Sequence, residues 1–235
     1  MRYMFSAAAL LAAAAVPARA QDVCSQYRPT PAMGSWAQYT STRDGQDFTT
    51  RVALVGQEKR DGKDAVWFES ASDSPRGKMI TETLVPSYPF APDAVMEVVV
   101  KRGDQPARKM SGAMMAMMRG QGGQGQAQGQ APGQPGGGRG GRGMGRPGGM
   151  SNWSEQCRSL SVVGQESVKV PAGTFTATHL HNAADSTDVW VSRQVPFGLV
   201  KSQTPRMSMQ LTATGKDAKK SITETPQEMS GMPGM

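Results

Sequence analysis

Methionine and histidine are the residue types in this sequence that could hold a metal ion. The chain has 17 Met but only 2 His. Thioether sulfur is a soft ligand suited to Cu(I), and several sulfurs on one short segment can surround a single ion. Two methionine groups have such spacing: Met114, Met115, Met117 and Met118, and then Met229, Met232 and Met235. They define a candidate copper site, and apolar helix packing by the first group is the alternative.

His179 and His181 are two residues apart in a stretch that alternates like a β-strand. Side chains two apart on a strand point to the same face, so both imidazoles could begin a metal site. Phe175 shares that face, and a half-buried sheet face explains the pattern equally well. The carboxylates Asp185 and Asp188 fall in a predicted turn, where we interpret them as solvated.

The two cysteines, Cys24 and Cys157, could form one disulfide bond. It would tie the start of the folded region to the point where the chain re-enters it after a Gly-rich stretch. In the chain-entropy model a loop of this length stabilises the fold by roughly 5 kcal/mol. Two unpaired thiols remain the alternative, and redox catalysis is not expected because no Cys-x-x-Cys motif is present.

No catalytic motif is recognisable. The chain has neither a Gly-x-Ser-x-Gly elbow nor a His-Glu-x-x-His motif, and no residue set suggests a nucleophile paired with a base. The Gly-x-Gly-x-x-Gly at residues 138–143 lacks the preceding strand and following helix of a dinucleotide site. We therefore expect a protein that is not an enzyme and that needs no cofactor.

Composition divides the chain into unequal parts. Between Gly120 and Gly149, 15 of 30 residues are Gly. Such a segment has too few apolar side chains to offset the conformational entropy lost on folding, so we expect it to be disordered. Residues 105–154 also hold six basic side chains and no acid, while the remaining mature chain carries a net charge near −1. The basic character belongs to this linker, so a nucleic-acid-binding face on the folded part is not expected.

The N-terminus has the pattern of a secretory signal peptide. Arg2 precedes an apolar run that ends near Val16, and Ala18-Arg19-Ala20 presents small residues to a signal peptidase. We expect cleavage after Ala20, a periplasmic or secreted protein, and no transmembrane segment.

Short strands joined by Gly and Asp turns make up most of the rest. Asp44-Gly45 and Asp61-Gly62 supply the positive φ of tight hairpins. No helix of crossover length separates the strands, which favours antiparallel pairing. The expected strands span residues 34–40, 48–55, 65–69, 78–85, 95–101, 160–163, 165–170, 175–180, 188–192, 199–202 and 208–214.

The expected architecture is mainly β: a curved antiparallel sheet or incomplete β-barrel with few helices, interrupted by the disordered Gly-rich insert. Its parts are a signal peptide (1–20), the first half of the β domain (21–110), a short Met-rich helix with the linker (111–151), the second half (152–216) and a flexible tail (217–235).

Three segments carry a family resemblance: residues 168–175, residues 188–192 around Trp190, and residues 195–201 around Phe197. Together they resemble uncharacterised exported bacterial proteins whose fold is similar to the LolA/LolB lipoprotein carriers. The resemblance implies an incomplete antiparallel barrel with a concave apolar face that could hold an acyl chain. It covers roughly residues 164–202, and the long Gly-rich insert and scarcity of helices depart from the carriers.

These observations favour a non-enzymatic exported protein that binds a hydrophobic ligand or an envelope partner, with a role in lipid or lipoprotein handling. Large apolar side chains on or next to expected strands are the candidate ligand-binding residues: Trp36, Trp67, Phe68, Phe175, Trp190 and Phe197. A Met-rich periplasmic copper-binding protein and a structural envelope protein without a ligand are the alternatives. The sequence leaves the ligand, the partner and the oligomeric state open.

Overall fold

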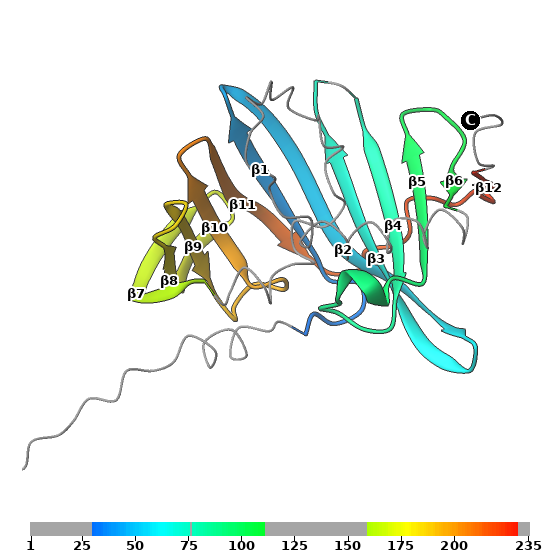
Figure 1. Ribbon diagram of the computed structural model, residues 1–235, viewed down its shortest axis with the longest axis horizontal. Helices are drawn as coiled ribbons and strands as arrows, with labels where there is room; N and C mark the ends of the chain where they lie inside the picture. Colours follow the sequence, from blue (N-terminus) through cyan, green and yellow to red (C-terminus); the bar gives the residue numbers. More distant parts are fainter. Residues whose placement is uncertain (1–29, 76, 111–158, 230–235) are drawn as a thin grey trace, which may run out of the picture.

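The structure is a computed structural model that describes residues 30–75, 77–110 and 159–229. Those residues form one open, curved sheet of 12 strands in the order β12-β6-β5-β4-β3-β2-β1-β11-β10-β9-β8-β7. Figure 1 shows β7 at one end of the sheet and β12 at the other. The predicted architecture, a mainly β chain with a curved sheet, is confirmed.

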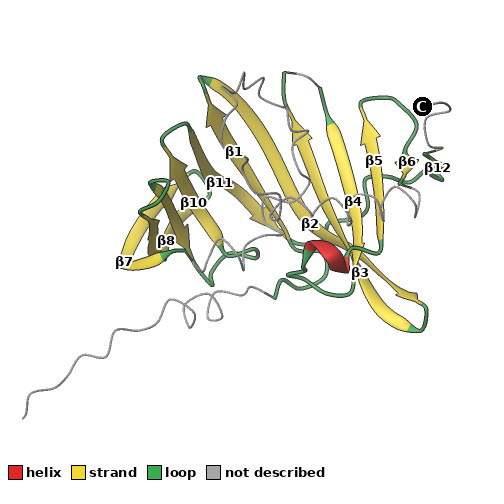
Figure 2. Cartoon of the chain, in the orientation of Figure 1, coloured by secondary structure: helices red, strands yellow, loops and turns green. Residues whose placement is uncertain are grey.

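The first part of the chain supplies six strands: β1 (Trp36–Arg43), β2 (Gln46–Arg60), β3 (Lys63–Asp73), β4 (Met79–Val85), β5 (Glu97–Arg102) and β6 (Arg108–Lys109). The second part supplies the other six: β7 (Ser161–Val170), β8 (Gly173–Asn182), β9 (Thr187–Val191), β10 (Leu199–Thr204), β11 (Met207–Gly215) and β12 (Gln227–Glu228). A 3-10 turn, η1 (Pro92–Ala94), is the helical segment drawn in Figure 2.

Pairing is antiparallel throughout, with one exception. β12 pairs with β6 in parallel, so the sheet is mixed where the sequence predicted an antiparallel one. The exception arises because residues 216–226 cross the sheet before β12 begins. No local sequence pattern predicts this crossing. The predicted strands 160–163 and 165–170 are a single strand, β7, whose pairing with β8 is irregular between Val162 and Gly164.

The hairpin turns follow the predicted chemistry. Asp44 and Gly45 have φ of 50° and 76°, and Asp61 and Gly62 have 52° and 74°. Positive φ at both central residues is the type I′ arrangement that matches the twist of the flanking strands. These turns fix the registers of β1 with β2 and of β2 with β3.

Apolar side chains are buried on both faces of the sheet. Along β2, Val52 and Leu54 join one cluster of buried residues, which we call the aromatic-face core. The alternate residues Ala53 and Val55 join another, which we call the strap-face core. Successive side chains of a strand point to opposite faces, so the central strands carry a packed layer on each side.

Candidate functional site

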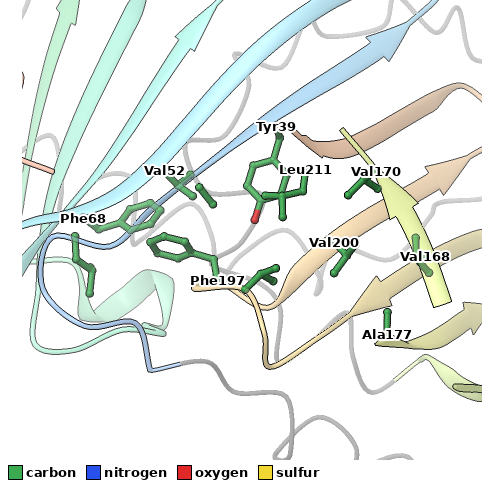
Figure 3. Close-up of a cluster of buried hydrophobic side chains, with 12 residues drawn as sticks. Tyr39, Val52, Phe68, Val168, Val170, Ala177, Phe197, Val200 and Leu211 are labelled. Atoms are coloured by element: carbon green, nitrogen blue, oxygen red, sulfur yellow. The ribbon is translucent and has the colours of Figure 1, made fainter. Parts of the chain in front are cut away.

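A cluster of aromatic rings stands out in the aromatic-face core. Phe68 of β3 stacks on Tyr88 with ring centroids 5.5 Å apart and meets Phe90 edge-on at 5.6 Å. Phe197 approaches Tyr88 at 5.3 Å and Phe68 at 6.3 Å. Figure 3 shows Phe68 and Phe197 facing each other beside Val52. Offset and edge-to-face pairs of this kind stabilise an apolar site beyond the area they bury.

Loops supply three of these four rings. Tyr88 and Phe90 lie between β4 and β5, and Phe197 lies between β9 and β10. Phe68 and Phe197 are buried, whereas Tyr88 and Phe90 are half-buried. The sheet therefore provides the floor of the site, and two irregular segments provide its cover.

The phenol groups near this cluster stay neutral. Burial raises the pKa of both Tyr39 and Tyr88 above the ordinary tyrosine range. The Tyr39 hydroxyl donates a hydrogen bond to the Leu199 carbonyl at 3.2 Å, which satisfies it within the core. The lining is thus apolar and uncharged over the physiological pH range.

The structure divides the six predicted ligand-binding residues between the two faces. Phe68 and Phe197 are members of the aromatic-face core, and Phe175 and Trp190 pack against it. Trp36 and Trp67 belong with the strap-face core. Sequence analysis missed Tyr88 and Phe90 because they lie outside the expected strands and also outside the segments that carry the family resemblance, one of which includes Phe197. The signal that could have found them is a loop alternating proline with aromatic residues, from Pro86 to Pro92.

The candidate copper ligands are not brought together within the described residues. Met229 follows β12 at one end of the sheet order, and its amide N–H donates to the Lys109 carbonyl. His179 and His181 lie on β8, close to the opposite end. The other residues of this hypothesis lie outside the described part, as do Cys24 and Cys157: Met114, Met115, Met117, Met118, Met232 and Met235.

Asp188 accepts hydrogen bonds from both histidines. It lies on β9, as the expected strand 188–192 has it, and is not a solvated turn residue; its Oδ1 is 2.7 Å from His179 Nε2 and 2.9 Å from His181 Nδ1. These bonds, first from His179 and then from His181, lower the pKa of Asp188. Among the described residues no group of three or more His, Cys, Asp or Glu could hold a metal ion.

Trp190 ties this polar cluster to the neighbouring strands. Its ring stacks on His179 at 4.5 Å, and Lys201 Nζ lies 4.7 Å from its centroid. Its indole N–H donates to Glu166, whose Oε1 is also 3.6 Å from His179 Nδ1. The imidazoles are therefore engaged by neighbouring side chains. Sequence analysis missed Glu166 and Asp188 because only strand pairing places them beside β8.

A cavity of about 340 Å³ opens near this cluster. Most of the residues that line it are of polar or charged type: Gln165, Thr176, Ala177, Thr178, Val191, Ser192, Arg193 and Gln194. Ser192 Oγ donates to the Thr176 carbonyl at 2.8 Å, and the Thr176 N–H donates to Gln194 Oε1 at 3.2 Å. The buried Ser192 hydroxyl thus donates to a backbone carbonyl, and these hydrogen bonds do not activate it as a nucleophile.

Within the described residues, no helix has both the length and the apolar character to cross a bilayer. No family model matches the sequence, and no curated protein matches it.

Solved structures with some similarity include three bacterial proteins. A candidate exported protein of YmcC-like fold from Bacteroides fragilis is 10% identical over 79% of this chain and 97% of its own, with a TM-score of 0.32. A candidate lipoprotein from Parabacteroides distasonis is 9% identical over 80% and 98%, with a TM-score of 0.33. A DUF1329 family protein from Desulfovibrio piger is 11% identical over 86% and 93%, with a TM-score of 0.31. Because similarity of this extent is weak, the function is inferred from the site alone.

Proposed function

We propose that this chain is a non-enzymatic exported protein that binds one apolar chain, such as the acyl chain of a lipid or lipoprotein. The ligand lies between the sheet floor at Phe68 and the loops that carry Tyr88, Phe90 and Phe197. The observation that carries the proposal is this four-ring cluster, in which the sheet supplies one ring and the loops supply three. The export signal in the sequence supports the location.

The loop rings occupy the place that the ligand would take. Loops connecting strands move more readily than the strands themselves, so Tyr88 and Phe90 can swing away while Phe68 stays fixed. An acyl chain would replace their contacts with the floor. At about 0.8 kcal/mol per buried methylene, eight methylenes contribute roughly 6 kcal/mol before the cost of ordering the chain.

The non-enzymatic part of the proposal has separate support. In the cavity lined by Ser192 and Gln194, the serine hydroxyl donates to a backbone carbonyl and the Gln194 side-chain oxygen accepts from a backbone N–H. The two histidines are held by Asp188. Neither arrangement leaves a base next to a nucleophile.

Fluorescent fatty-acid titration of the purified, delipidated protein tests the proposal. We expect saturable binding that weakens at least tenfold in Phe68→Ala, since this change removes the floor of the site. Trp36→Phe, on the other face of the sheet, is the matched control and should bind as the unchanged protein does. Absence of saturable binding, or equal binding by Phe68→Ala and the control, would contradict the proposal.

A further inference from the structure

The chain after β11 lies across the strap-face core as an extended segment. We call residues 216–229 the strap and the surface beneath it the strap groove. The Ala218 N–H donates to the Gly34 carbonyl at 2.9 Å, and the strap ends by pairing β12 with β6. Sequence analysis assigned residues 217–229 to a flexible tail, and nothing in their local pattern indicates a docking partner.

Two buried carboxylates form the centre of the strap groove. Glu69 of β3 and Glu82 of β4 are directly opposite each other in the strand register, and each is 1% exposed. The Ser221 N–H and hydroxyl both donate to Glu69 at 2.8 Å, and the Ile222 N–H donates to Glu82 at 3.0 Å. Neighbouring buried carboxylates need such donors, and here a bound peptide backbone supplies them.

Three side chains of the strap are recognised separately. Lys220 Nζ lies 3.6 Å from the centroid of the Trp67 ring and 3.3 Å from Glu82 Oε2. Ile222 is a member of the strap-face core at 6% exposure. Glu224 Oε1 accepts from Lys101 Nζ at 2.6 Å and from the Ala107 N–H at 3.2 Å. The strap groove therefore recognises charge, side-chain shape and backbone direction, through residues at alternate positions of the strap.

The residues that form the strap groove are more buried than the strap residues that lie in it. Of the strap residues, every one of which is described, only Ile222 is buried. Most of the floor beneath is buried, and its largest buried members are Trp67, Ile80, Leu84 and Val99. A floor of paired strands covered by a mostly exposed segment resembles a recognition site with its ligand in place, because removing the strap would take away only the edge strand β12 and leave the pairing of the other strands unchanged.

We propose that the strap groove is a peptide-recognition site for an extended segment of another exported protein, which takes the place of the strap. The partner segment carries a lysine, a β-branched apolar residue two positions later and an acidic residue two positions after that. The pattern is the one that Lys220, Ile222 and Glu224 present to the groove. The strap is the competitor in the unbound protein, acting at an effective concentration on the order of millimolar.

The test uses the full-length chain and a fluorescent synthetic peptide with the sequence of residues 216–229. In the Ile222→Ser chain, whose own strap is weakened, we expect the peptide to bind at least tenfold more tightly than to the unchanged chain. The exposed neighbour provides the control, since Thr223→Ser should behave as the unchanged chain does. A peptide with Ser in place of Ile222 should lose at least tenfold in affinity. Equal binding to all three chains, or none, overturns the proposal.

A second measurement on the unchanged chain does not depend on the folding of a variant. We expect the amides of Ser221 and Ile222 to exchange with deuterium at least a hundredfold faster than those of β3 and β4 beneath them. Equal exchange rates would show that the strap cannot leave without unfolding the sheet, which overturns the proposal. Concentration-dependent dimerisation that exchanges straps would assign the groove to a second copy of this chain instead, and would likewise overturn it.

Discussion

Each tryptophan in the described residues has a cation over its ring and an oxygen for its indole N–H. The cations lie between 3.6 and 4.8 Å from the ring centroids. A partly buried tryptophan has an apolar ring and one donor, and both must be satisfied where the sheet meets water. The sets are Trp36 with Arg51 and the Lys216 carbonyl, Trp67 with Lys220 and Glu58, and Trp190 with Lys201 and Glu166.

Gly215 is required by the Trp36 ring that lies across from it. The two residues are register partners, and a Cβ on Gly215 would come within 2.5 Å of ring atoms. The ring cannot shift freely, because Arg51 covers it and its N–H is bonded. We expect Gly215→Ala to lower the free energy of unfolding by about 1–3 kcal/mol in urea titration. Gly164→Ala, where the Cβ meets nothing within 4 Å, should change it by less than about 0.5 kcal/mol. Equal losses in both variants would contradict this account.

The Asp188 carboxylate makes the free energy of unfolding depend on pH in the acidic range. Its folded-state pKa is lowered by the His179 and His181 hydrogen bonds from an ordinary value of 3.8. The stability that the carboxylate contributes is present above that ordinary pKa and is lost as the pH falls through the lower folded-state value. We expect Asp188→Asn to cost about 1–2 kcal/mol at pH 7 and progressively less below pH 4. Urea titrations at pH 7, 4 and 3 measure the difference, and a constant difference would show that the carboxylate charge is not responsible.

At the scale of elements, turn chemistry could be predicted because it is local. Gly45 has φ of 76°, and a Cβ there meets nothing within 4 Å. The cost of a side chain is therefore conformational rather than steric. We expect Gly45→Ala to lower the free energy of unfolding by about 1–2 kcal/mol, measured by thermal and urea unfolding. The same Gly164→Ala variant is the control, since its backbone has no positive φ. A neutral Gly45→Ala would indicate that this turn is not held in the type I′ form.

Contacts between separate strands and loops could not be predicted from the sequence. Phe68 was identified because it lies on a strand, whereas Tyr88 and Phe90 pack against it from a loop. Glu82 is flanked by Thr81 and Thr83 on β4, and a charged residue in such a polar run looks like a solvent-facing position. In the fold it is buried, and it accepts a hydrogen bond from the N–H of Ile222, 140 residues later in the chain. Strand period and turn residues specify local geometry, but a loop or strap that docks on a sheet leaves no periodic signature.

At the scale of the molecule, the two described parts of the chain complete one sheet. β1 is hydrogen-bonded to β2 on one side and to β11 on the other, and the β1–β11 register runs from Trp36 opposite Gly215 to Arg43 opposite Met207. The aromatic-face core draws residues from both parts, including Tyr39 and Phe68 from the first and Val200 and Leu211 from the second. Figure 3 shows Tyr39 and Leu211 side by side in this core. The strap then crosses back over the first part.

This interleaving predicts that neither part is stable alone but that the two assemble. Separate production of residues 21–110 and 152–235, under reducing conditions that exclude a Cys24–Cys157 link, would leave β1 and β11 as unpaired edges with half of a core exposed. We expect each fragment alone to show no cooperative thermal transition and poor dispersion of amide NMR signals. Mixed in equal amounts, they should give one cooperative transition and restore fatty-acid binding. Arg51→Glu in the first fragment removes the cation that contacts Trp36 and Glu69 but leaves every backbone pair of the β1–β11 seam in place, so it serves as a control that weakens but does not abolish assembly. A cooperative transition in either isolated fragment would mean that the sheet is divided into independent domains at the β1–β11 seam, since that is the boundary along which the two parts meet.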